Sequence, residues 1–542
     1  MGIIALLFSQ IMIKVIGLAY KLYLTNKTGF GDAGNAIYSA GFQIYALLLT
    51  FSSIGVPNSI SKIVSERLAI GDNRGAHKVF KIAFFTFAFF GLIGTIILFL
   101  GAKIIANNFL EIPEAEYSLI ALSPSIFFVS ITSVIRGYFN GRQKLSVTAK
   151  SQTIEQIFKS VFTILLVEFV AVITKNNTML MAAIANLATT VATIISFVYI
   201  YIYYRIRRKE IAAEISKSVN YVPTRIRKTL KIILKESLPI SLSSLMSSFN
   251  KNIDLFTVVK ILKKNMSEQN AKTLYGILSG KIDTLCVLPL SLNIAFVTGM
   301  VPSISKNLAI GDKEQVIKKV QSFLQITIII SLPCTVGLII YSKEILNLLF
   351  PNANRGEILL QINAISIFFA MISQTINGVL QGIGKSSSPL IAFSIGLFLK
   401  FFANVFFISN PIIGIKGAAI GNIICNVMVF SIGFFCLKKN LRLKIEFEKL
   451  FLKPIFATLL MSVYAIILKI LLKNIILKKS ISISVILTSA MIYGATIATL
   501  RTIKTTQWKI FFKKKRDFIE DWRIVKIVVH MMLIALKWLH KL

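Results

Sequence analysis

Apolar stretches long enough to cross a lipid bilayer recur along almost the whole of this 542-residue chain. A helix of about 20 residues crosses the hydrocarbon core of a bilayer, which is about 30 Å thick, and about fourteen such stretches can be counted. They cover residues 3–24, 36–57, 79–102, 117–138, 149–173, 178–204, 237–261, 278–302, 316–342, 357–380, 389–409, 414–437, 452–473 and 480–500. The pattern predicts an all-α polytopic membrane protein.

The distribution of charge predicts how the chain crosses the membrane. Lys and Arg number 61 against 23 Asp and Glu, and the formal net charge is +38. The loop after the sixth stretch is rich in Lys and Arg, whereas the loop after the third carries Glu111, Glu114 and Glu116. Because basic loops remain in the cytoplasm, we expect a multi-pass protein with both termini cytoplasmic. Topology and anionic lipids account for the positive charge, so no nucleic-acid partner is expected.

One phrase occurs twice in the sequence. Residues 56–72 read VPNSISKIVSERLAIGD, and residues 301–312 read VPSISKNLAIGD. Six predicted spans separate the copies, and an even number of crossings returns the chain to the same side, so the two halves are predicted to be parallel repeats. A second match supports this: at one constant spacing, Gly137, Gly141, Lys144 and Lys159 correspond to Gly378, Gly382, Lys385 and Lys400.

The repeat predicts the organisation of the domains. We expect two six-helix lobes related by a pseudo-two-fold axis along the membrane normal, with two C-terminal helices appended. The predicted units are an N-lobe at 1–204, a basic cytoplasmic linker at 205–236, a C-lobe at 237–437, two further spans within 438–500 and a basic cytoplasmic tail at 501–542. In the tail, residues 524–539 are predicted to form an amphipathic helix in the membrane interface, with a fifteenth span as the alternative.

Motifs of enzymes are not found in the sequence. The stretch GVLQGIGKS at 378–386 is one residue too long for a phosphate-binding loop and joins two predicted spans. No HExxH or GxSxG motif occurs, and the four cysteines have no metal-ligand spacing. We therefore expect a protein that is not an enzyme and has no metal or cofactor. An ion gradient or the membrane potential remains as a driving force.

Ionisable residues at membrane depth are the candidate site, because each costs about 2.5–3.5 kcal/mol at the centre of a spanning helix. In a transporter with repeats, the substrate binds between the lobes. Lys14 and Lys400 have no acid nearby in sequence and are predicted to line a cavity that receives an anion. For Lys14, pairing with another helix or snorkelling is the alternative. Lys21 lies near a helix end and is expected to snorkel.

The other candidates lie in acid–base pairs along the sequence. Glu155 and Lys159 are four residues apart, which favours an ion pair on one helix, with lining of the cavity as the alternative. Lys251 and Asp254 are three residues apart and are also predicted to pair. The two-residue spacing of Lys281 and Asp283 places them on different faces, so at least one of them is expected to have a partner elsewhere.

Four basic residues are predicted at the cytoplasmic mouths of the lobes, where they serve as topology signals or as first contacts for phosphates. They are Arg136, Arg142, Lys144 and Lys385. An excess of lysine in the predicted cavity suits an anionic substrate, whereas an antiporter that expels cations would expose acidic residues.

Three segments of the sequence resemble a known family. They are IKVIGLAYKLYLTNKTGFGDAGNAIYSAGFQIYALLLTFSSIGVPNSISKIVSE, RGYFNGRQKLSVTAKSQTIEQIFK and AKTLYGILSGKIDTLCVLPLSLNIAFVTGMVPSISK. Together they are similar to the polysaccharide-transporter branch of the multidrug/oligosaccharidyl-lipid/polysaccharide exporter superfamily. Within that branch they resemble the group of stage V sporulation protein B and the lipid II flippases.

The resemblance implies a fourteen-helix flippase of the bacterial cytoplasmic membrane. It would carry an undecaprenyl-diphosphate-linked oligosaccharide, most simply the peptidoglycan precursor lipid II, across the membrane by alternating access. Lys14 matches a basic residue of the family on span one, whereas neutral Gln43 stands where some lipid II flippases carry arginine. The implied partners are the lipid-linked sugar diphosphate, membrane lipids and proteins of cell-wall synthesis.

Two other functions remain open at this point. The first is a cation-coupled drug or metabolite antiporter, in which Glu155, Asp254 and Asp283 would bind the coupling ion. The second is a membrane partner of a cell-wall synthase that does not itself transport.

Overall fold

The computed structural model is built from helices throughout the part of the chain that it describes. The described residues are 2–50, 56–216, 218, 225–309, 312–385, 387–441, 451–472 and 479–500. No strand occurs among them. The tail at 501–542, including the predicted interfacial helix at 524–539, lies outside the described residues.

The helices follow the predicted spans closely. In chain order they are α1 (Gly2–Asn26), α2 (Gly31–Thr50), α3 (Val56–Ala69), α4 (Asn73–Ile104), η2 (Ile105–Leu110), α5 (Ala115–Gly141), α6 (Leu145–Ile173), α7 (Thr178–Ile206), α8 (Arg208–Ser216), α9 (Ile226–Leu262), α10 (Glu268–Gly276), η3 (Ile277–Ile282), α11 (Asp283–Ala309), α12 (Lys313–Ile340), α13 (Ser342–Leu349), α14 (Glu357–Gly382), α15 (Ser387–Ser409), α16 (Lys416–Leu441), α17 (Lys453–Leu471) and α18 (Lys479–Thr499). The all-α membrane class is confirmed.

Eleven helices of the described chain are long and apolar enough to cross a membrane. They occupy the places of all predicted spans except the first, second and seventh, where the chain forms α1, α2 with α3, and α9. The repeated phrase VPNSISK begins α3, and its second copy continues α11, so both copies are helical where they are described.

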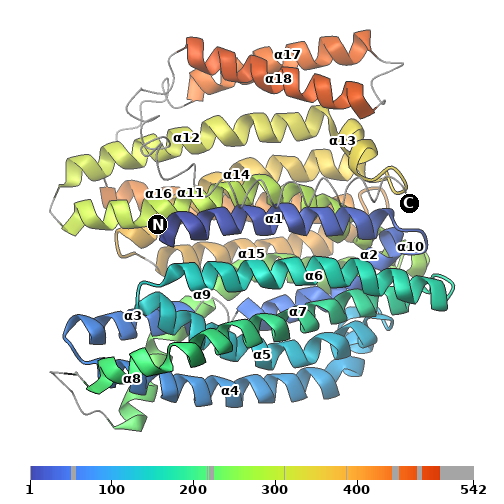
Figure 1. Cartoon of the computed structure of the whole chain (residues 1–542). Coiled ribbons are helices and arrows are strands. Elements are labelled where there is room, and N and C mark those ends of the chain that lie inside the picture. The colour runs from blue at the N-terminus through green and yellow to red at the C-terminus, as the bar shows by residue number, and fades with distance from the viewer. Residues whose placement is uncertain are drawn as a thin grey trace.

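The helices pack in two groups whose internal order is the same. We call α1 to α7 the N-bundle and α9 to α16 the C-bundle. In the N-bundle α1 packs on α6, α6 on α7, α7 on α5 and α5 on α4. In the C-bundle α9 packs on α15, α15 on α16, α16 on α14 and α14 on α12. Such a match is expected of a repeat of six helices. In Figure 1 α12 and α14 lie in the upper part of the view and α5 and α4 in the lower part.

The last two helices, α17 and α18, pack on each other and against α12 at the edge of the C-bundle (Figure 1). The Tyr493 hydroxyl donates to the backbone oxygen of Ile329 at 2.7 Å, and Lys469 forms an ion pair with Glu344 at 3.1 Å. These contacts fix the pair to the C-bundle.

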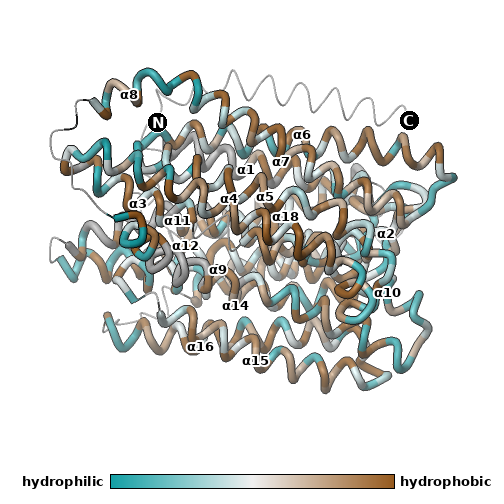
Figure 2. Tube along the Cα trace, turned by 90° about the horizontal axis from the view of Figure 1, so that it is seen from below, coloured by the Kyte–Doolittle hydropathy of each residue, from teal (hydrophilic) through white to brown (hydrophobic). Residues whose placement is uncertain are grey.

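The outer surface is apolar where the helices are expected to meet lipid. Phe85, Leu100, Phe169 and Phe406 are large exposed side chains on α4, α6 and α15. Figure 2 shows hydrophobic colour along most of the helical length, with hydrophilic residues gathered near the ends. This distribution is typical of a multi-pass membrane protein.

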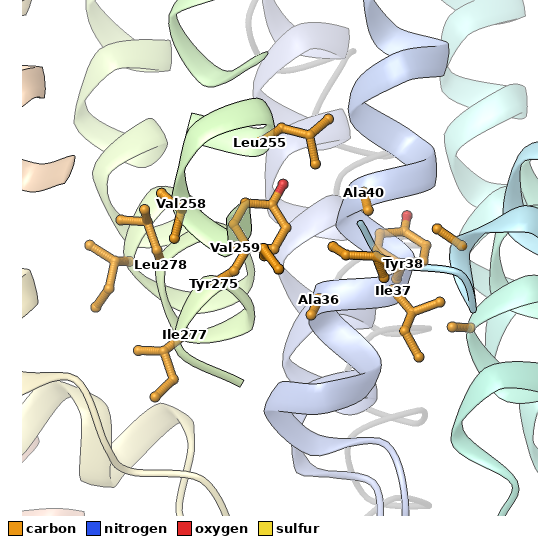
Figure 3. Packing of buried hydrophobic residues seen from close by; sticks show 14 of the residues in the cluster. Ala36, Ile37, Tyr38, Ala40, Leu255, Val258, Val259, Tyr275, Ile277 and Leu278 are labelled. Atoms are coloured by element: carbon orange, nitrogen blue, oxygen red, sulfur yellow. The ribbon is translucent and has the colours of Figure 1, made fainter. Parts of the chain in front are cut away.

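The two bundles meet differently at their two ends. We call the end with α3 and α8 the linker end and the end with α10 and α13 the far end (Figure 1). At the far end one hydrophobic cluster combines Tyr38 of α2 with Leu255 of α9 and Tyr275 of α10, and Figure 3 shows these side chains around the contact. At the linker end there are two clusters: one is built on α3 to α8 and includes Ile233 of α9, and the other is built on α11, α12, α14 and α16.

Candidate functional site

The lysines that correspond in the repeat lie at matching places in the two bundles. Lys159 is on α6, which packs on α1, and Lys400 is on α15, which packs on α9. Both side chains are buried, with 8% of Lys159 and 0% of Lys400 exposed. Their surroundings differ, and this difference decides what each lysine can do.

Lys159 is held by aromatic rings. Its ammonium lies 4.1 Å from the centre of the Phe42 ring and 5.5 Å from that of Tyr20. The negative face of an aromatic ring attracts a cation, but it does not cancel a full charge as a carboxylate does. The ammonium of Lys159 therefore keeps most of its capacity to bind an anion.

Lys21 on α1 provides a second ammonium of the same kind. It lies 4.5 Å from the centre of the Tyr38 ring, and the hydroxyls of Tyr20 and Tyr38 are 3.2 Å apart. Only 7% of its side chain is exposed, so the expectation that Lys21 snorkels to the membrane surface is wrong. The charges of Lys159 and Lys251 repel that of Lys21, whereas Asp283 attracts it.

We call Lys21, Lys159, Lys251 and Asp283 the lysine cluster. Within the described part of the chain, neither Lys21 nor Lys159 forms an ion pair. Asp283 is the acid of the cluster, and its charge also interacts with Lys251, Asp254 and Lys400. The cluster joins α1 and α6 of the N-bundle to α9 and α11 of the C-bundle, and it holds more positive than negative charge.

The predicted ion pair between Glu155 and Lys159 does not form. Glu155 instead accepts from the guanidinium of Arg136 at 2.7 Å, and the same guanidinium donates to the hydroxyls of Ser151 and Ser196, each at 2.9 Å. Arg136 offers several donors in a planar fork and so satisfies three acceptors at once, which a lysine one helical turn away cannot do. Arg136 is also only 8% exposed, so its guanidinium is buried within the N-bundle; its place at the cytoplasmic mouth stays a prediction.

Lys400 is surrounded by oxygen atoms. Its ammonium donates to the carboxylate of Asp254 at 2.7 Å, the side-chain oxygen of Asn422 at 2.7 Å and that of Asn250 at 2.8 Å, and it also contacts the backbone oxygen of Asn250. Asn404 donates to the other oxygen of Asp254 at 2.9 Å. An ammonium has three donors and here meets four acceptors, so its hydrogen-bonding capacity is filled from within the protein.

The predicted pair of Lys251 with Asp254 is therefore replaced by the pair of Lys400 with Asp254. Lys251 and Asp283 are both partly buried, and each contributes to the lysine cluster. Lys281 has the distant partner that its spacing from Asp283 requires, because its ammonium lies 2.9 Å from Asp32 on α2. That prediction is confirmed.

The remaining predicted residues are spread along the chain. Arg142 donates to the Tyr138 hydroxyl at 2.9 Å and pairs with Glu214 of α8, which holds that helix to the N-bundle. Lys144 is partly buried before α6, and Lys385 is exposed at the linker end. Lys14 belongs to α1, but its side chain lies outside the described part of the structure. Among the described residues, no group of acids, histidines and cysteines could hold a metal ion.

Several residues of the site carry no strong signal in the sequence. Lys21 was available as a second lysine on the first span, seven residues after Lys14. The rings of Tyr38 and Phe42 stand four residues apart on α2, a spacing that places them on one helical face. Residues of this kind are common in membrane helices, so only their contacts with lysine mark them as part of the site.

Comparisons with known proteins agree with this architecture. The family model described as "Polysaccharide biosynthesis protein" matches residues 1–308, and the MatE model matches residues 273–406. Lipid II flippase MurJ of Bacillus subtilis (strain 168) is 23% identical over 456 residues, which cover 81% of this chain and 82% of that protein. Stage V sporulation protein B of the same organism is 22% identical over 458 residues, which cover 83% and 85%.

Solved structures show the same fold. Lipid II flippase MurJ in an inward closed conformation superposes with a TM-score of 0.68 at 19% identity, covering 95% of this chain and 99% of that one. An inward-facing multidrug resistance MATE family transporter of the MOP superfamily gives 0.66 at 16% identity, covering 81% and 98%. These relatives are transporters or flippases and not enzymes.

Proposed function

Because the chain belongs to the polysaccharide biosynthesis protein family, we propose that it is a flippase for an undecaprenyl-diphosphate-linked oligosaccharide of the lipid II type. The observation that carries this proposal is the pair of buried ammonium groups, Lys21 and Lys159, which rest on aromatic rings without an ion-pair partner in the described chain. A diphosphate supplies the negative charge that such a site lacks, and lysine binds phosphate as a point charge.

The rest of the cycle follows from the arrangement of the bundles. The N-bundle and C-bundle, which correspond to residues 1–204 and 237–437, would rock against each other around the lysine cluster. The basic linker would lie in the cytoplasm together with both termini, so the far end would face outward. The diphosphate and sugars would bind between the bundles while the polyprenyl chain stays in lipid. Lys14 stays a prediction for the same site.

The two bundles are in contact at the far end. This contact is consistent with a conformation in which the space between the bundles is closed to the outside. At the linker end the N-bundle contacts the C-bundle through Ile233 of α9, and cargo from the inner leaflet would enter when this contact separates. In such a site the ammonium groups act more strongly than in water, because the surrounding helices are apolar.

A cation-coupled antiporter is a weaker interpretation of the same residues. Two of its three coupling carboxylates are already neutralised, Glu155 by Arg136 and Asp254 by Lys400. Of the three carboxylates, Asp283 is the one that forms no salt bridge in the described chain. The positive charge of Lys251 lowers the attraction of Asp283 for a cation.

The double variant Lys21→Gln with Lys159→Gln tests the proposal. We expect flipping of a labelled undecaprenyl-diphosphate sugar in proteoliposomes to fall by about tenfold or more for each lysine, since a hydrogen bond to a charged group contributes about 1.5–3 kcal/mol. Lys318→Gln is the matched control, because Lys318 is exposed on α12 and pairs only with Glu314 one turn away. Normal flipping by the double variant, at normal levels in the membrane, would rule out the lysine cluster as the diphosphate site.

A separate experiment addresses which glycan is carried. A bacterium whose own lipid II flippase has been replaced by this chain should survive if the cargo is lipid II. Death of that strain, together with flipping of another lipid-linked oligosaccharide in proteoliposomes, would retain the flippase and exclude lipid II.

A further inference from the structure

Among the described residues, ion pairs between the two bundles gather at the far end, and those found there all have the same polarity. Lys281 of η3 lies 2.9 Å from Asp32 of α2. Lys272 of α10 lies 2.7 Å from Glu114, which precedes α5. Lys263, which follows α9, pairs with Glu111. In each pair the acid comes from the N-bundle and the lysine from the C-bundle.

The burial of these pairs increases toward the interior. The side chains of Lys263 and Glu111 are 39% and 17% exposed, those of Lys272 and Glu114 are 8% and 34% exposed, and those of Lys281 and Asp32 are 0% and 10% exposed. Lys281 also donates to the backbone oxygen of Ala353, which fixes its ammonium in place. A carboxylate left alone at the inner position would be poorly solvated, so the innermost pair should have the largest effect on closure.

The backbones at this end are in direct contact. A β-carbon added to Gly276 would lie 1.8 Å from the backbone oxygen of Asp32, and one added to Gly280 would lie 2.5 Å from the side chain of Asn35. The shared hydrophobic cluster continues this contact inward, with Ala36 and Tyr38 on one side and Val259 and Tyr275 on the other (Figure 3). The far end is therefore closed by packing as well as by charge.

We propose that these three ion pairs form a charge-matched outer gate, in which acids of the N-bundle lock onto lysines of the C-bundle. The pairing sets how often the far end opens. Glu111 also lies 3.9 Å from Lys260, and Lys272 also pairs with Glu268 of its own helix, so the Lys281–Asp32 pair gives the gate its most specific contact. The assignment of the far end to the outside rests on the orientation in the proposed function; the gate itself rests on the contacts.

The opposite polarity of the two faces has a testable consequence. Reversing one charge of the innermost pair places two like charges in contact, which disfavours closure. Reversing both charges restores an attractive pair in the same place. A residue that only supports folding would not show this pattern, because two wrong charges would then do more damage than one.

The test uses a cysteine reporter buried in the closed gate. Asn35 is fully buried against Gly280, so Asn35→Cys should react with a membrane-impermeant maleimide only when the bundles separate. The reporter is placed in the full-length chain with its four native cysteines changed to alanine, and the reagent is added outside intact cells. The variants are Lys281→Asp, the double variant Asp32→Lys with Lys281→Asp, and Lys318→Asp as a control on an exposed pair within α12.

We expect slow labelling in the parent, labelling at least about tenfold faster in Lys281→Asp, and a return to the parent rate in the double variant. Labelling of Lys281→Asp at the parent rate, or fast labelling of the double variant, would overturn the gate. If Lys281→Asp does not reach the membrane, Asp32→Lys alone provides the other single reversal of the same pair and is compared with the same double variant.

This readout is independent of the cargo. Labelling needs no lipid substrate, so the gate can be confirmed even if the flippase assay fails. Changes to Lys21 and Lys159 should abolish flipping. They should leave unchanged the difference in labelling rate between Lys281→Asp and the double variant. If the same charge-swap pattern is seen only with reagent added to the cytoplasmic side of the membrane, in inverted vesicles, the gate stands and the proposed orientation is wrong.

Discussion

We expect the Lys400→Met variant to lose about 3–5 kcal/mol of free energy of unfolding, the cost of removing one partner from a buried ion pair. The side chain of Lys400 is fully buried, and without its ammonium the carboxylate of Asp254 keeps only its bond from Asn404. The side-chain oxygens of Asn250 and Asn422 would also lose their donor. Methionine fills most of the space of the lysine chain, so loss of packing contributes little.

Thermal unfolding of the purified protein in detergent measures this effect. Lys318→Met is the control, because its pair with Glu314 is exposed and screened by solvent and should contribute little to stability. If Lys400→Met unfolds like the parent but no longer flips lipid, then Lys400 contacts the cargo, as the sequence predicted, and its bonds to Asp254 and the asparagines must open during transport.

We expect Gly276→Ala to keep the far end open and to stop transport while leaving the protein folded. The added methyl group would lie 1.8 Å from the backbone oxygen of Asp32, a distance that only separation of α10 from α2 can relieve. Overpacking of this kind costs about 1–3 kcal/mol, so the closed fraction should fall by roughly tenfold to a hundredfold. No charge is changed, which separates this variant from the charge swaps.

Labelling of Asn35→Cys and flipping in proteoliposomes are the two measurements for Gly276→Ala. Gly337→Ala is the matched control, since a β-carbon on that helical glycine of α12 would meet nothing within 4 Å. Fast labelling with loss of flipping is the expected result. Slow labelling and normal flipping would mean that α10 shifts to accept the methyl group and that the contact is not tight in the working protein.

Hydrophobic length was enough to predict the helices, and the repeated phrase led to the expectation of two six-helix lobes. Each predicted span is long enough to bury its backbone hydrogen bonds in lipid only as a helix, so the class follows from composition along the chain. The correspondence of Lys159 with Lys400 also led to equivalent places, on α6 against α1 and on α15 against α9. The sequence carries the positions of the helices and of these two lysines because both depend only on spacing along the chain.

The partners of the charged residues could not be predicted in the same way. The spacing of Glu155 and Lys159 favours an ion pair, but Arg136 from another helix binds Glu155 together with two serines. Lys400 looked isolated because its acid, Asp254, is 146 residues away in sequence. Such pairs depend on which helices become neighbours, and spacing along one helix contains no record of that.

The positive charge of the lysine cluster has a consequence for the energetics of the membrane. One elementary charge moved across a potential of 100 mV changes in free energy by about 2.3 kcal/mol. When no diphosphate is bound to Lys21 and Lys159, a membrane potential that is negative inside the cell would oppose outward movement of the lysine cluster. The same potential would favour its return. A bound diphosphate would cancel this charge, so that the loaded protein moves with little electrical work. The aromatic rings that hold the two lysines without neutralising them would thus let voltage distinguish an empty carrier from a loaded one.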